Sequence, residues 1–105
     1  MSKVRIMLAC AAGMSTSLLV TKMQNAAKAK GIDAEIYALS VGEASVKIDD
    51  KPEELDIVLL GPQVKYMKND FAKKVEGKSI KLDVINMMDY GMMNGEKVLD
   101  AALAL

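Results

Sequence analysis

The chain contains no histidine and a single cysteine among its 105 residues. Without histidine it can form neither a Cys-His nor a Ser-His catalytic pair and cannot carry a phosphohistidine. One cysteine cannot make an internal disulfide, and without histidine it cannot complete a zinc site of the common kind. Any covalent chemistry therefore has to use Cys10, and any histidine that takes part belongs to another protein.

Aromatic residues and net charge are scarce as well. There is no tryptophan, there are one phenylalanine and three tyrosines, and 14 basic residues balance 14 acidic ones. Balanced charge and few rings for base stacking argue against a nucleic-acid partner. Neither a signal segment nor a run of about 18 apolar residues occurs. We therefore expect a cytoplasmic monomer that does not insert into the membrane and uses no cofactor and no metal.

What the chain does have is a regular alternation of apolar runs and helical patterns. Apolar runs predict strands at residues 4–9, 34–39, 56–60 and 80–85. Apolar positions at helical spacing predict helices at residues 15–30, 63–76 and from about 94 onward, and Ser40 with Glu43 predicts a short helix to about residue 47. Residues 48–54 are expected to be a surface connection and residues 86–91 a loop.

This alternation predicts an α/β fold with one domain over residues 1–105. We expect three layers: a four-stranded parallel sheet in the order 2-1-3-4, with helices on both faces because the crossovers are right-handed. In such a sheet the ligand crevice lies at the carboxyl ends of the strands, where the winding reverses between strands 1 and 3. Three segments should border it: the residues after the first strand, the turn Gly61-Pro62-Gln63, and residues 86–91.

The segment after the first strand is Cys10-Ala11-Ala12-Gly13-Met14-Ser15-Thr16-Ser17. A helix N-terminus favours the thiolate form of a nearby cysteine and binds anions through its backbone N–H groups. Small side chains let an anion approach the main chain, and the hydroxyls of the last three residues add donors or cap the helix. The segment is typical of a phosphoryl-binding loop, although a buried cysteine before an ordinary capped turn is an equally good interpretation of the pattern alone.

Two other uses of such a loop can be compared with this sequence. Low-molecular-weight tyrosine phosphatases need an arginine six residues after the cysteine, and that position here is Thr16. Without this cation, hydrolysis of a phosphocysteine would be poorly catalysed, so the loop is better suited to holding a phosphoryl group than to releasing it to water. A redox role lacks the second cysteine that would resolve an oxidised Cys10.

Methionines and tyrosines near the predicted strand ends are further candidates. The methionines are Met87, Met88, Met92 and Met93. They could form a soft partner-binding surface, but we expect them to fill the core. Tyr66 and Tyr90 could face a ligand, but we expect each to be half-buried with a solvated hydroxyl.

The run from Cys10 to Leu19, followed by Val58-Leu59-Leu60-Gly61-Pro62-Gln63-Val64, strongly resembles the enzyme IIB component of the bacterial phosphoenolpyruvate-dependent sugar phosphotransferase system, lactose/cellobiose type. The resemblance runs through essentially the whole chain, but residues 41–54 hold no motif that can be aligned. It implies a phosphoryl relay in which Cys10 accepts the group from a phosphohistidine of IIA and passes it to a sugar bound by the membrane transporter IIC.

The same resemblance implies roles for the residues around Cys10. Phosphoryl oxygens would be held by Ala11, Ala12, Gly13, Met14, Ser15, Thr16 and Ser17, and the site would be bordered by Gly61, Pro62 and Gln63. Met14 would contact both partners in turn. The alternative function is a Cys-dependent phosphatase or arsenate-reductase-like enzyme, and the identity of the sugar stays open.

Overall fold

A computed structural model of the chain describes residues 3–11 and 14–105, apart from the side chains of Met14 and Ser15. The sheet consists of β1 (Val4–Cys10), β2 (Ala34–Ser40), β3 (Ile57–Leu60) and β4 (Lys81–Val84). Its order is β2-β1-β3-β4 and every neighbouring pair is parallel. The predicted sheet and its order 2-1-3-4 are therefore confirmed.

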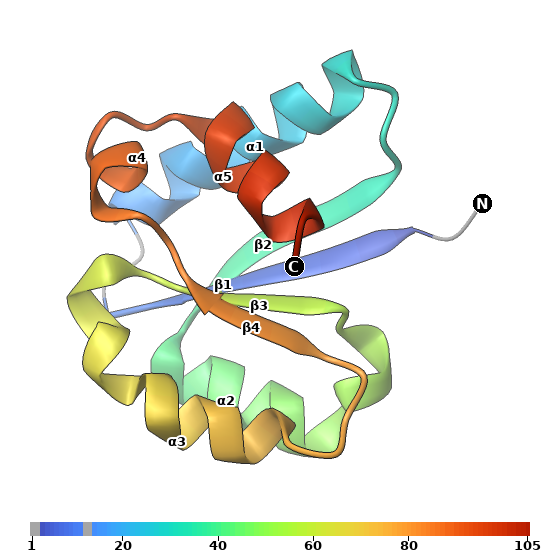
Figure 1. Ribbon diagram of the computed structural model, residues 1–105, viewed down its shortest axis with the longest axis vertical. Helices are drawn as coiled ribbons and strands as arrows, with labels where there is room; N and C mark the ends of the chain where they lie inside the picture. Colours follow the sequence, from blue (N-terminus) through green and yellow to red (C-terminus); the bar gives the residue numbers. More distant parts are fainter. Residues whose placement is uncertain (1–2, 12–13) are drawn as a thin grey trace.

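Helices cover both faces of the sheet, as Figure 1 shows. They are α1 (Met14–Ala29), α2 (Val41–Asp50), α3 (Lys68–Val75), α4 (Met87–Gly91) and α5 (Gly95–Leu103), with short 3-10 turns at η1 (Pro52–Glu54) and η2 (Pro62–Met67). α1, α4 and α5 lie on one face, and α2 and α3 lie on the other. Because side chains alternate along a strand, Ile6 and Leu8 of β1 enter the first core, while Met7 and Ala9 enter the second.

Several helix ends follow the sequence signals closely. The Ser40 hydroxyl accepts a hydrogen bond from the Glu43 backbone N–H at 3.2 Å, and the Glu43 carboxylate accepts one from the Ser40 N–H, which completes the predicted capping box. The Asn94 side chain caps α5 by accepting from the Lys97 N–H at 3.1 Å. Gly31 follows α1 with φ of 71°, a conformation that favours glycine.

The prediction of a surface connection at residues 48–54 was wrong in its first half. α2 continues to Asp50, and Ile48 is completely buried in the core under that helix. The charged neighbours Asp49 and Asp50 masked this apolar position in the sequence, because a single buried residue per turn gives little periodicity. Pro52 then opens the 3-10 turn η1, where its missing N–H costs nothing.

The predictions for the segments that follow β3 and β4 were also wrong in part. The helix expected at residues 63–76 is interrupted: η2 holds Val64 at φ of −119°, and α3 begins only at Lys68. The expected loop at residues 86–91 contains the helix α4, because the Asn86 side chain caps it by accepting from the Met88 and Asp89 N–H groups. A helix of five residues is too short to show a period in the sequence.

Candidate functional site

Cys10 is the last residue of β1 and lies at the carboxyl edge of the sheet. It stands opposite Ser40 in the register with β2, and its Sγ is 3.9 Å from the backbone carbonyl oxygen of Leu39. Only 2% of the Cys10 side chain is exposed. The parallel register therefore brings a segment of the edge strand against the thiol, and sequence reasoning did not identify this segment because strand register cannot be read from composition.

The turn after β3 also reaches Cys10, as the sequence predicted. The Gly61 N–H donates to the Ala9 carbonyl oxygen at 2.9 Å, and a Cβ placed on Gly61 would lie 3.5 Å from the Cys10 Cβ. A Gly61 side chain would therefore meet the base of Cys10 directly. Pro62 is buried and Gln63 is exposed. Two segments that lie 51 positions apart in the sequence thus meet beside Cys10.

The structure describes only part of the rest of the predicted loop. Ala11 is exposed, whereas Ala12 and Gly13 lie outside the described residues. Met14 and Ser15 belong to the first turn of α1, but their side chains lie outside the description, so the expected partner contact of Met14 stays a prediction. Thr16 and Ser17 follow in the same turn, and they differ in burial.

Thr16 is only 1% exposed, and its hydroxyl lies 3.3 Å from the Tyr90 hydroxyl of α4. Ser17 is exposed, and its carbonyl oxygen accepts from the Thr21 hydroxyl at 3.2 Å. The expectation of a half-buried Tyr90 with a solvated hydroxyl was wrong, since the residue is 8% exposed and belongs to the core. The same expectation was wrong for Tyr66 in the opposite sense, because 76% of it is exposed.

The four methionines near the last loop are mostly outside the core. Met87 is 65% exposed, and Met88 and Met92 are each 71% exposed. Met93 alone packs against the core on the α1 side of the sheet. The core-filler prediction is therefore wrong for three of the four methionines. A helix of one turn has only one buried side, and on α4 Tyr90 occupies it.

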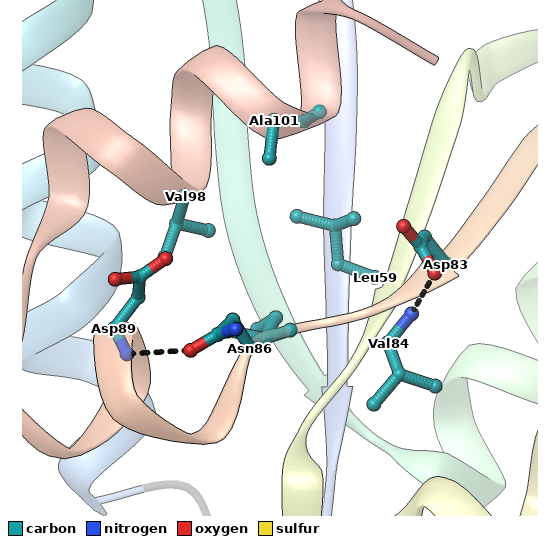
Figure 2. Close-up of a pocket in the computed structure, with 9 residues that line it drawn as sticks. Leu59, Asp83, Val84, Asn86, Asp89, Val98 and Ala101 are labelled. Atoms are coloured by element: carbon teal, nitrogen blue, oxygen red, sulfur yellow. Dashed lines mark hydrogen bonds between the residues drawn. The ribbon is translucent and has the colours of Figure 1, made fainter.

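A small cavity lies near the end of β4, beneath α5 (Figure 2). Its volume is about 30 Å³, enough for one or two water molecules. The Asn86 side-chain oxygen accepts from the Asp89 N–H at 3.1 Å, and the Asp83 carboxylate accepts from the Val84 N–H at 2.8 Å. Neither Cys10 nor Gly61 lines this cavity. It is too small for a sugar and is separate from the thiol.

The ion pairs with resolved pKa shifts lie toward the amino edge of the sheet, away from Cys10. A hydrogen bond with Glu96, helped by Asp100, raises the pKa of Lys30 just after α1. A hydrogen bond with Glu54 raises the pKa of Lys47, and the same bond lowers the pKa of Glu54 just before β3. These surface pairs therefore have no direct contact with the candidate site.

The single arginine of the chain, Arg5, is also at that opposite end. Its Nε lies 3.3 Å from the Asp56 carboxylate, and it precedes Cys10 by five residues of extended strand. At roughly 3.3 Å per residue this separates their Cα atoms by about 16 Å. Arg5 therefore cannot act on a phosphoryl group at Cys10 as the arginine of a phosphatase loop does.

Comparison with known proteins identifies the family of this chain. The model of the family "PTS system, Lactose/Cellobiose specific IIB subunit" matches residues 5–101. The chain belongs to this IIB family. It is 54% identical to the PTS system galactose-specific EIIB component of Lactococcus lactis subsp. cremoris and 54% identical to the cellobiose-specific EIIB component of Lactococcus lactis subsp. lactis, in each case over 92% of this chain and 91% of the relative.

The fold has solved counterparts. The lactose-specific IIB domain from Streptococcus pneumoniae superposes with a TM-score of 0.82, at 17% identity, over 98% of this chain and 97% of that one. As a IIB component, the chain is a phosphotransferase subunit of a sugar-transport system that works with IIA and IIC components. Within residues 3–11 and 14–105, no helix combines the length and apolar character needed to span a bilayer.

Proposed function

We propose that the chain is the phosphoryl carrier of its transport system, with Cys10 as the residue that is phosphorylated. The observation that carries the proposal is the position of the only cysteine of a IIB protein, at the carboxyl end of β1 and against the Gly61 turn. This is the edge where ligands bind in a parallel sheet of this order. Membership of the IIB family supplies the reaction class.

The relay requires two displacements at phosphorus. In the first, the Cys10 thiolate attacks the phosphohistidine of IIA, an S–P bond forms, the P–N bond breaks, and the imidazole leaves and takes up a proton. In the second, a hydroxyl oxygen of the sugar held by IIC attacks, an O–P bond forms, and Cys10 leaves as the thiolate. The hydroxyl proton passes to a base of the transporter, where the sugar is bound.

The phosphoryl group is held by neutral donors in this proposal. Main-chain N–H groups and hydroxyls would come from Ala11, Ala12, Gly13, Met14, Ser15, Thr16 and Ser17, with Gly61, Pro62 and Gln63 at the border. The only arginine is paired with Asp56 at the far end of β1. A carrier benefits from this arrangement, because a strong cationic clamp would stabilise the phosphocysteine and slow its transfer onward.

Overall sequence similarity does not identify the sugar. Two relatives that are equally identical to this chain, at 54%, are named for galactose and for cellobiose. We propose that the IIC transporter selects the sugar and that this protein acts in the cytoplasm, associating with the membrane only through IIC. The proposed docking of Met14 is tested by Met14→Asp, which should slow transfer from IIA and transfer to the sugar.

The test of the carrier function is phosphorylation by purified, phosphorylated IIA, followed by intact mass measurement. The wild-type chain should gain one phosphoryl group, and a peptide map should place it on Cys10. Cys10→Ser should gain none under the same conditions. Because Cys10 is the only cysteine, a thiol reagent can modify no other cysteine. The wild-type chain can therefore be unfolded, alkylated and refolded, and the alkylated chain should also gain no phosphoryl group.

The phosphatase alternative makes a different prediction for the same protein. Rapid release of inorganic phosphate from a small aryl phosphate, dependent on Cys10, would support the phosphatase and contradict the carrier. A carrier should instead retain its phosphoryl group through gel filtration away from IIA and lose it when IIC and sugar are added.

A further inference from the structure

The contact between Thr16 and Tyr90 joins two elements that are distant in sequence. Thr16 is in the first turn of α1, Tyr90 is on α4, and 74 residues separate them. Their hydroxyl oxygens are 3.3 Å apart. Among the side chains whose burial is described, Thr16 is the only polar one that is buried. A polar group in this position has to be hydrogen-bonded, because leaving it without a partner would cost about 1 to 3 kcal/mol.

Tyr90 is also the residue that attaches α4 to the core. The helix has five residues, and Met87 and Met88 on it are exposed while the Tyr90 ring is 8% exposed. The ring packs in the apolar core between the sheet and α1. The position of α4 and the position of the α1 start are therefore fixed relative to each other by one buried side chain and its hydroxyl.

We infer that Tyr90 is a positioning residue for the phosphoryl transfer proposed at Cys10, and this inference rests on that proposed function. The first N–H groups of a helix have no partner within the helix and can point at an anion. In α1 these groups directly follow the Cys10 loop. By holding the Thr16 hydroxyl, Tyr90 fixes the first turn of α1, and with it the direction of the donors that would receive the phosphoryl oxygens.

The decisive variant is Tyr90→Phe in the full chain, which keeps the ring in the core and removes only the hydroxyl. Phosphorylated IIA is the donor, and the rate at which Cys10 gains the group is measured by rapid quenching. We expect a decrease of about threefold, because the neutral hydrogen bond with Thr16 is lost and this contact of 3.3 Å is a long one. The ³¹P chemical shift of the phosphocysteine should also move. A loss of overall stability alone would not change this shift.

Tyr66→Phe is the matched control, since it removes the same hydroxyl from a tyrosine that is 76% exposed. Its transfer rate and ³¹P shift should equal those of the wild type. Thr16→Val removes the other side of the same contact without touching the aromatic ring. It should reproduce the effect on the ³¹P shift, and the double variant should be no slower than the slower single variant.

The outcomes separate the two proposals. If the wild-type chain never gains a phosphoryl group from IIA, the carrier function is wrong. If the wild type is phosphorylated but Tyr90→Phe accepts the group at the wild-type rate with an unchanged ³¹P shift, Tyr90 is only a structural anchor and the inference is overturned, even where Tm falls. If Tyr90→Phe does not fold, Thr16→Val decides between the same two results.

Discussion

The two helix layers differ in how closely their helices approach one another. On the face that carries α1, α4 and α5, helix backbones approach one another closely. A Cβ on Gly95, the first residue of α5, would lie 2.6 Å from backbone atoms of Lys22 and Met23 in α1. The buried Thr16–Tyr90 contact belongs to the same face. This layer therefore allows little change in the distance between its helices.

On the opposite face, α2 and α3 pack through large side chains, and the ion pair given between these two helices is exposed. Phe71 and Ile48 fill the core there, and the Lys74 amino group lies 3.0 Å from the Asp49 carboxylate at the surface. Side chains can adjust their rotamers where backbones in contact cannot. The comparison indicates that the more rigidly packed layer is the one that holds the helix following Cys10, which a site with fixed donors requires.

The largest expected effect that tests this comparison is Gly95→Ala. The new Cβ would meet backbone atoms of α1, which cannot move away without shifting the helix. We expect the free energy of unfolding to fall by about 3 kcal/mol, the upper part of the usual range for overpacking. Denaturant titration measures it.

The matched control for this substitution is Gly42→Ala in α2, where a Cβ would meet nothing within 4 Å. Alanine should raise the free energy of unfolding there by about 0.5 kcal/mol, because it restricts the unfolded chain. If the two alanine variants changed stability equally, the proposed difference between the layers would be wrong.

A smaller effect is expected from the helix caps, and it should be the same on both faces. Ser40→Ala removes the capping box of α2, and Asn94→Ala removes the side-chain cap of α5. Each loss should cost about 1 kcal/mol in the free energy of unfolding, measured by the same titration. If the two caps cost the same, the layers differ only through the backbone contact at Gly95. If Asn94→Ala costs much more than Ser40→Ala, the cap of α5 also contributes to the difference between the layers.

The sheet was predictable from the sequence because its signals are local and repeated. β1 and β3 are largely apolar runs that stand out in the sequence, and Gly31 and the Ser40–Glu43 box mark helix ends directly. The order of the strands is the usual one for a small parallel sheet with helices on both faces. The meeting of Cys10 with the Gly61 turn could be predicted for the same reason, since both end neighbouring strands.

The remaining features depend on contacts that no local pattern contains. Gly95 was not recognised because its role depends on how closely α1 passes, not on its own neighbours in sequence. Tyr90 and Thr16 needed the position of α4, a helix too short to show a period. The exposed methionines were misjudged for the same reason, because hydrophobicity alone does not tell which side of a single turn faces the core.

The smallest expected effect concerns the ion pair on the α2 side. The Lys47 amino group lies 3.1 Å from the Glu54 carboxylate and holds the pKa of Glu54 below its ordinary value of 4.5. A lowered carboxyl pKa adds stability above that ordinary value, and this stability is lost as the pH falls through the folded-state pKa. Glu54→Gln should therefore lower Tm at pH 7 by no more than about 2 °C, since the pair is exposed. The difference from wild type should vanish below the folded-state pKa of Glu54, as thermal scans across an acid pH series would measure. Glu53→Gln, a neighbour with no ion pair among the described residues, is the control and should show no such pH-dependent difference.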